Sequence, residues 1–293
     1  MTMTNLTTMK TFRIISILSV CAIAAACNKS NTCTDTGFTV KGTILSTKAP
    51  SLDATGAGSF SEGDKISLFF NTAGLTIYSG YTFGEKNYWN DLEIPSGTSS
   101  VSATGCYPAV PSETPDNFIF DCSTENGETD FLAGEKVQVS PFLTQSIEMS
   151  FKHILHKLSV SLEASGDGIS AEDLKGATVS CSGVLPKAAM NLLEGTAGKA
   201  SGTPHEFRKT GDKTHFIIPP QATDDIKIKI SVAGRDYTMS GQDFSVNGQK
   251  VTYLYSGQTL SVKIKVSKSS FSVIGQTIGS WTSQGEINGE IEI

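Results

Sequence analysis

Apolar and polar residues alternate along several short segments of the chain, and this alternation predicts β-strands. Residues 226–232 and 260–266 show it most clearly, since every second residue is Ile, Leu or Val and those between are Lys or Ser. Phe38, Val40 and Ile44 follow the same rule. Because strand side chains point alternately to two faces, each segment is predicted to bury one face and expose the other.

The segment from Ile147 to Leu162 changes parity partway along. Ile147, Met149, Phe151, His153 and Leu155 share one parity, whereas Leu158, Val160 and Leu162 share the other. A single regular strand cannot bury both sets on one face, so a bulge or break is predicted near His156–Lys157. Shorter strands are predicted at 65–70 and 118–120. Only 171–176 and 188–194 have weak helical character.

Short strands and abundant Gly, Ser and Thr predict an all-β fold with many turns. A boundary is predicted near residue 144, just before the strand that begins at Ile147. It gives an N-terminal β-sandwich at 37–144 and a C-terminal one at 145–293, both of ordinary domain size.

The first 26 residues have the pattern of a secretory signal peptide. Lys10 and Arg13 precede an apolar run of about 13 residues that ends in small residues, shorter than the ~20 that a membrane-spanning helix needs. The start of translation is open between Met1 and Met9. Residues 1–26 are therefore left out of the predicted fold.

Cys27 follows Ile23-Ala24-Ala25-Ala26, which resembles the lipobox of bacterial lipoproteins. The resemblance implies a diacylglycerol on the sulfur and a further acyl chain, such as palmitate, on the new amino terminus. Two or more chains give stable membrane anchoring. Residues 27–36 are then a lipidated tether. The alternative is an ordinary secreted protein with Cys27 as a plain thiol.

Charge and cysteine content narrow the possible partners. Without the signal peptide the chain keeps 21 basic and 29 acidic residues, a net charge of −8. No basic stripe is present, so no nucleic-acid partner is predicted. Four cysteines remain besides Cys27, and four allow three pairings. A Cys106–Cys122 disulfide and buried free thiols are both open, with the thiols favoured.

No catalytic motif, metal-binding spacing or phosphate-binding loop occurs in the sequence, so neither an enzyme nor a cofactor is predicted. His153 and His156 lie in a strand pattern that points them to opposite faces, which disfavours a shared metal. Tyr88 and Trp89 could stack on a sugar ring, and packing within the sandwich is the favoured alternative.

The order of several short motifs resembles the fimbrillin-like family, the lipoprotein pilins called type V. The motifs are Phe60-Ser61-Glu62-Gly63-Asp64-Lys65-Ile66, Cys106-Tyr107-Pro108, Phe151-Lys152-His153-Ile154-Leu155-His156-Lys157-Leu158, Phe216-Ile217-Ile218-Pro219-Pro220-Gln221, and Ile278-Gly279-Ser280-Trp281. The resemblance implies two transthyretin-like β-sandwiches in series. It implies export to the outer membrane and the cell surface, and a place in a fimbrium after processing.

The resemblance also implies assembly by strand complementation with other pilin subunits. A protease removes the N-terminal segment with the first strand, here Gly37–Leu45, and the next subunit's extended segment fills the groove. Lys48-Ala49 stands where family members often carry the arginine that is cut. The residue is lysine, so either the protease differs or this subunit is not cut.

Gly285–Ile293 is the candidate donor segment, with Ile287, Ile291 and Ile293 on one parity. The alternative is that these residues form the last strand of their own sandwich. Two functions follow: a fimbrial subunit that supports adhesion, or a monomeric surface lipoprotein that binds a glycan or a host or bacterial surface ligand.

Overall fold

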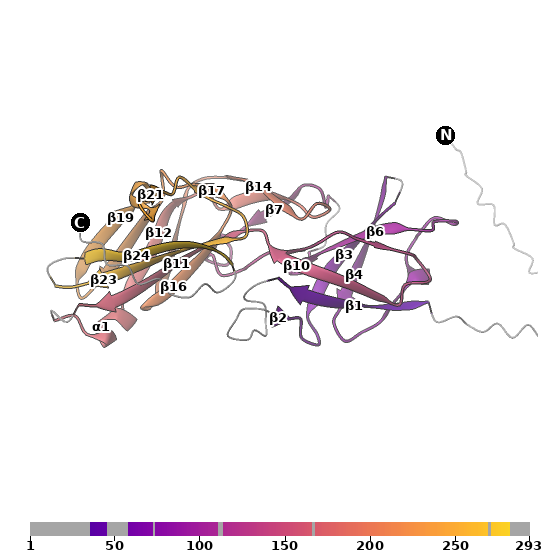
Figure 1. Ribbon diagram of the computed structural model, residues 1–293, viewed down its shortest axis with the longest axis horizontal. Helices are drawn as coiled ribbons and strands as arrows, with labels where there is room; N and C mark the ends of the chain where they lie inside the picture. The colour runs from indigo at the N-terminus through magenta and orange to yellow at the C-terminus, as the bar shows by residue number, and fades with distance from the viewer. Residues whose placement is uncertain are drawn as a thin grey trace, which may run out of the picture. The chain divides into compact units, whose positions relative to one another are not determined.

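The structure is a computed structural model that describes residues 36–45, 58–72, 74–110, 114–165, 168–268 and 271–281. All its elements belong to the unit Thr36–Ile293 (Figure 1). Within these ranges the fold is all-β and sandwich-like, as predicted. Helical structure there is confined to α1 (Ala171–Lys175) and two 3₁₀ turns, η1 (Trp89–Asp91) and η2 (Gly241–Asp243).

The first sheet has nine strands and contains the predicted strand at residues 38–44. Its path is β2-β1-β10-β8-β6-β3-β4, with β5 paired to β1 and β9 paired to β6. The strands are β1 (Gly37–Ile44), β2 (Gly58–Ser59), β3 (Lys65–Thr72), β4 (Leu75–Thr82), β5 (Asn87–Tyr88), β6 (Val101–Tyr107), β8 (Leu132–Gly134), β9 (Val137–Val139) and β10 (Ser146–His153).

Two four-stranded sheets enclose the core of the C-terminal half, with paths β16-β11-β23-β24 and β15-β12-β18-β19. The two clearest predicted strands are confirmed as β18 (Lys227–Val232) and β23 (Gln258–Val266). The others are β11 (His156–Ala164), β12 (Thr178–Val184), β15 (His205–Thr210), β16 (Lys213–Ile218), β19 (Arg235–Ser240) and β24 (Phe271–Ser280).

A three-stranded sheet, β14-β13-β7, joins segments that are far apart in the sequence. Its strands are β7 (Phe118–Asp121), β13 (Lys187–Asn191) and β14 (Thr196–Ser201). The helical expectation at 171–176 is confirmed by α1, but that at 188–194 is wrong, because β13 pairs with both β7 and β14. The remaining short pairs are β17 (Gln221–Ala222) with β22 (Tyr253–Leu254) and β20 (Ser245–Val246) with β21 (Gln249–Lys250).

The predicted break lies at Ile154–Leu155, between β10 and β11. It explains the change of parity: Met149 and Phe151 pack in the core of the first sheet, whereas Leu158 and Val160 pack in the C-terminal core. The division into 37–144 and 145–293 stays a prediction with one correction. Ser146–His153 pairs with β1 and β8, so the change of sheet comes after it and not before Ile147.

His156 begins β11 and is held as a neutral imidazole. Its Nδ1 donates to the Tyr255 carbonyl at 2.9 Å, and its Nε2 accepts from the Leu260 amide at 3.3 Å. Burial lowers the pKa of His156 from 6.5 to about 4, although the bond to Tyr255 opposes this shift. Because Nε2 is an acceptor, protonation would break the bond to β23.

This buried imidazole predicts a loss of stability in mild acid. The unfolded chain protonates His156 near pH 6.5 while the folded chain resists until about pH 4. The free energy of unfolding should therefore fall between pH 6.5 and 4, by about 3 kcal/mol from this group. Urea titrations across this range should show a smaller decrease for His156→Gln. The control His205→Gln should keep the wild-type slope, and an unchanged slope in His156→Gln would contradict the assignment.

Candidate functional site

The candidate site is β1 with the surroundings that hold it, called here the β1 site. Phe38, Val40 and Ile44 are 0%, 5% and 3% exposed, while Lys41 and Thr43 face water. This is the alternation that the sequence predicts for a strand with one buried face. Each buried apolar side chain of this size contributes about 1.5–3 kcal/mol relative to exposure.

The backbone of β1 is paired mainly on one side. Residues 39–44 run parallel to residues 146–151 of β10, as the two labelled arrows show (Figure 1). On its other side, the strand partners of β1 among the described residues lie at its ends, with β5 at Gly37–Phe38 and β2 at Thr43–Ile44. Between these ends, the Val40 amide donates to the Tyr81 hydroxyl at 3.0 Å. Within the described residues, β1 therefore depends on β10 for most of its strand pairing.

The first half of β1 packs against aromatic rings. The Phe38 ring lies 4.4 Å from the Trp89 ring and 5.9 Å from Phe70, between centroids. Trp89 is fixed in turn, because its Nε1 donates to the Thr144 carbonyl at 2.8 Å and its backbone amide to the Thr36 carbonyl at 3.1 Å. The segment before β10 thus helps to hold the ring that packs on β1.

Gly42 lies where β1 crosses a pair of stacked rings. Phe60 and Phe83 stack with centroids 4.4 Å apart. A Cβ atom at Gly42 would lie 2.5 Å from Phe60 and 2.9 Å from Phe83, too close for a real contact. The inward positions of β1 therefore read Phe, Val, Gly and Ile, and the third must have no side chain.

The burial of Trp89 corrects one expected ligand contact. Its side chain is 0% exposed, so it offers no ring face to a sugar, and the favoured alternative of packing within the sandwich holds. Tyr88 is 46% exposed. Its neighbour across β5–β1 is Gly37, and nothing in the described structure ties it to a ligand site.

Several other predicted site residues lie outside the described residues. They are the lipidation residue Cys27, the processing residues Lys48 and Ala49, and the donor residues Ile287, Ile291 and Ile293. The described chain leaves β1 at Leu45 and resumes at Gly58, the first residue of β2. The predicted cut therefore falls between the strand to be removed and the next strand of the same sheet.

His153 and three of the cysteines are buried, and their contacts are those of residues packed in a core. His153 pairs with Asp130 and stacks on Trp281 with 4.1 Å between centroids. Cys106, Cys122 and Cys181 are buried free thiols, as favoured, and burial raises the pKa of each to about 12. Within the described ranges, no group of side chains could hold a metal ion. The helical part of that region offers no segment long and apolar enough to cross a membrane.

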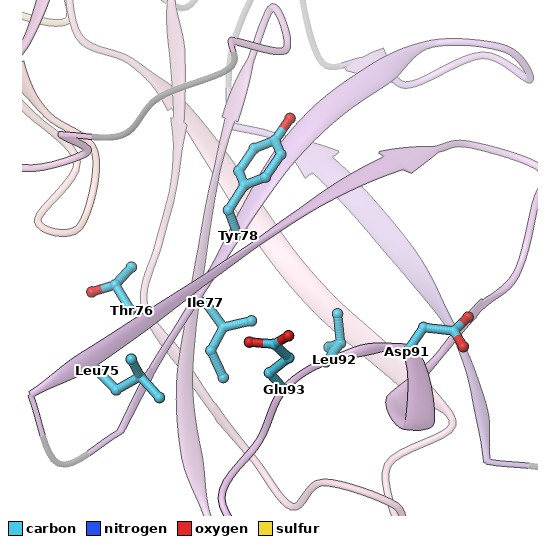
Figure 2. A pocket seen from close by; sticks show the side chains of 7 residues that line it. All are labelled: Leu75, Thr76, Ile77, Tyr78, Asp91, Leu92 and Glu93. Carbon is cyan, nitrogen blue, oxygen red and sulfur yellow. The ribbon is translucent and has the colours of Figure 1, made fainter. Parts of the chain in front are cut away.

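A surface pocket of about 380 Å³ opens beside β4. Figure 2 shows its lining residues, which come from Leu75–Tyr78 and Asp91–Glu93. The sequence pattern missed it, because it joins an edge strand to a turn whose position depends on the burial of Trp89. No short motif marks such a pairing.

Comparison with known proteins supplies the family. The profile described as fimbrillin-like matches residues 47–281. No curated protein sequence matches significantly.

Solved structures with a similar fold include three proteins from Bacteroides species. One is a "putative cell adhesion protein" from Bacteroides uniformis, with 21% identity, a TM-score of 0.63 and coverage of 85% of this chain and 99% of that one. A protein with the same description from Bacteroides ovatus has 14% identity and a TM-score of 0.59, covering 84% and 98%. A third, from Bacteroides thetaiotaomicron, has 20% identity and a TM-score of 0.52, covering 88% and 99%.

The close approach at Gly42 predicts a measurable cost of a single methyl group. Gly42→Ala should lower the free energy of unfolding by about 1–3 kcal/mol, because the new Cβ must displace the Phe60–Phe83 pair. Gly80→Ala is the matched control, since the nearest atom to its Cβ would be the Tyr78 hydroxyl at 3.8 Å. Urea denaturation of both variants measures the difference, and equal stabilities would show that the rings yield freely.

Proposed function

Because the chain belongs to the fimbrillin-like family, we propose that it is a structural subunit of a fimbrium that supports adhesion, assembled by exchange of the β1 strand. It is exported as a lipoprotein acylated at Cys27 and reaches the outer membrane. A protease cuts at Lys48–Ala49, and β1 leaves together with the lipid. The extended segment of the next subunit then takes its place.

The pairing of β1 is the observation that supports this proposal. β8 pairs with residues 151–153 of β10, so residues 146–150 have β1 as their strand partner in the described structure. Loss of β1 would leave bare the amides and carbonyls of these residues that point toward it, and would empty the places of Phe38, Val40 and Ile44. Unpaired strand edges readily accept another chain, and pockets for alternate side chains select which one.

The donor segment of another copy fits these places in one direction. Read backwards from the C-terminus, Ile293, Ile291, Gly289 and Ile287 match Phe38, Val40, Gly42 and Ile44 in order. Gly289 then meets the Phe60–Phe83 rings, which leave no room for a side chain. A donor running in the same direction as β1 over the same places would put Ile291 against those rings. We therefore propose that the donor runs antiparallel to β1.

One charge pair changes in this exchange. Lys41 of β1 pairs with Glu148 of β10 at 3.4 Å, and both side chains are mostly exposed. In the proposed register Glu290 replaces Lys41 and faces Glu148. Water and salt screen the repulsion between Glu290 and Glu148, so it weakens binding of the donor segment only slightly.

A monomeric surface lipoprotein that binds a glycan remains the second candidate. The partly exposed Tyr88 is the one observation that favours it, since the buried Trp89 does not support it. The two candidates differ in whether β1 is retained.

The state of the N-terminus tests the proposal directly. Protein from sheared cell-surface material should begin at or near Ala49 and carry no lipid, because the cut removes β1. N-terminal sequencing and intact mass measure this. A start at lipidated Cys27 in all of the recovered protein would mean that β1 stays, and would overturn polymerisation by strand removal in favour of an anchor or a surface binder.

The donor register predicts which substitution stops assembly. In processed subunits, Gly289→Val should abolish SDS-resistant polymers, because a β-branched side chain cannot fit against Phe60 and Phe83. Asn288→Val is the matched control in the same segment and should assemble normally, since it faces outward. Polymers formed equally by both variants would refute the antiparallel register without refuting strand exchange.

A further inference from the structure

The opposite end of the first sheet carries a second open edge, which the proposed function does not use. Four strands, β10, β8, β6 and β3, separate β1 from β4 along the path. β4 pairs with β3 from Leu75 to Thr82, and among the described residues no strand pairs with its other side. We call this side, at residues 75–78, the β4 edge.

Hydrogen bonds show which backbone groups point outward from β4. The Phe83 amide donates to the Asp64 carbonyl at 2.9 Å, so the odd-numbered residues of this strand bond toward β3. The Gly80 carbonyl accepts from the Asn87 side chain at 2.8 Å, so the even-numbered residues face away. Since these directions alternate in an antiparallel pair, the amides and carbonyls of Thr76 and Tyr78 point outward.

Asn87 covers the neighbouring part of β4 and not the β4 edge itself. Its side-chain amide bonds to the Ser79 hydroxyl at 3.1 Å and to the Gly80 carbonyl at 2.8 Å. No such cap is present at Thr76 and Tyr78 in the described structure. Proteins normally cover or twist an open strand edge because such an edge attracts other strands. The uncapped β4 edge is therefore available for pairing with another strand.

The pocket lies along the β4 edge and is lined by both apolar and acidic side chains. Figure 2 shows Ile77, Leu92 and Glu93 on one side of β4 and the Tyr78 ring on the other. Leu75 and Tyr78 are both 45% exposed, so apolar surface borders the edge. Asp91 and Glu93 are exposed acids, and no basic side chain of the described chain forms an ion pair with either.

The negative charge of Asp91 and Glu93 indicates which extended segments could bind at the β4 edge. The chain's own last residues, 282–293, contain Glu286, Glu290 and Glu292 and no basic residue, so the two acids of the pocket would repel them. A second copy paired through the same edge would bring like charges together. An extended segment with a lysine or arginine would pair with the edge and place its cation beside Asp91 and Glu93.

We propose that the β4 edge binds an extended segment of another protein, which adds as a strand beside Thr76 and Tyr78 while its lysine or arginine side chain lies between Asp91 and Glu93. The backbone bonds supply affinity without regard to sequence, and the acids select the charge. Leu75, Ile77 and Leu92 contact the apolar side chains that share a face with that cation. The β4 edge lies outside the β1 site, and η1 links the two, because Trp89 packs on Phe38 of β1 and Asp91 lines the pocket.

The test uses the full chain and fluorescein-labelled peptides of seven residues. The first peptide alternates threonine and valine around a central lysine. The second replaces that lysine with glutamate. The third keeps the lysine but is N-methylated on alternate amides, which prevents strand pairing. Fluorescence anisotropy at low salt measures binding, and hydrogen exchange of the amides at 75–78 locates it.

The lysine peptide should bind at least tenfold more tightly than either of the other two and should slow exchange at Thr76 and Tyr78. Asp91→Asn with Glu93→Gln should weaken it at least tenfold, whereas Glu125→Gln with Asp224→Asn, the same charge change elsewhere, should not. Thr76→Pro should also abolish binding, since it removes an outward amide while leaving the backbone bonds between β4 and β3.

Three results would overturn the proposal. They are equal affinity for the lysine and glutamate peptides, no binding by millimolar peptide, and protection confined to a region other than β4. Concentration-dependent dimerisation that Thr76→Pro abolishes would make a second copy the occupant instead. All these measurements use the full chain with β1 in place, so none of the results bears on whether β1 is exchanged in the proposed function.

Discussion

The pairing between β1 and β10 is the interaction on which the first sheet depends. Among the described residues β8 pairs with β10 at 151–153, so β1 is the strand partner of the first half of β10. The same contact places Phe38 against Trp89, and Trp89 bonds to the residue that leads into β10. Backbone pairing, aromatic packing and the path of the loop therefore support one another at a single strand.

The segment of β10 and β11 connects this arrangement to the rest of the chain. It contributes to three clusters of buried side chains: one under the first sheet, one in the C-terminal half and a third between them that contains Ile154, Leu155 and Trp281. His153 and His156 flank the break, and each is fixed by a distant segment. A chain that must bury alternate side chains in two different cores needs such a break.

The sequence predicts the regular strands well and the non-local contacts poorly. Residues 226–232 and 260–266 each bury one face against a single core, so their alternation reflects their surroundings directly. Residues 188–194 were misread because Ala, Met and Leu favour helices, yet pairing with β7 and β14 overrides this propensity.

The features of the β1 site also divide into those that the sequence predicts and those that depend on non-local contacts. Phe38, Val40 and Ile44 can be predicted from their alternation, and their burial follows. The burial of Trp89 and the exclusion of a side chain at Gly42 depend on rings brought from other segments of the chain. The pocket beside β4 likewise joins residues that only the folded sheet brings together.

The parallel direction of β1 along β10 also has a mechanical consequence. A strand that is pulled along its own axis loads all its ladder bonds in shear, so they must fail nearly together. A strand that is peeled from one end loses them one at a time and at lower force. When force acts along the strand axis, the six residue pairs between β1 and β10 share the load. β1 therefore resists force along its own axis and separates more readily when it is peeled from one end.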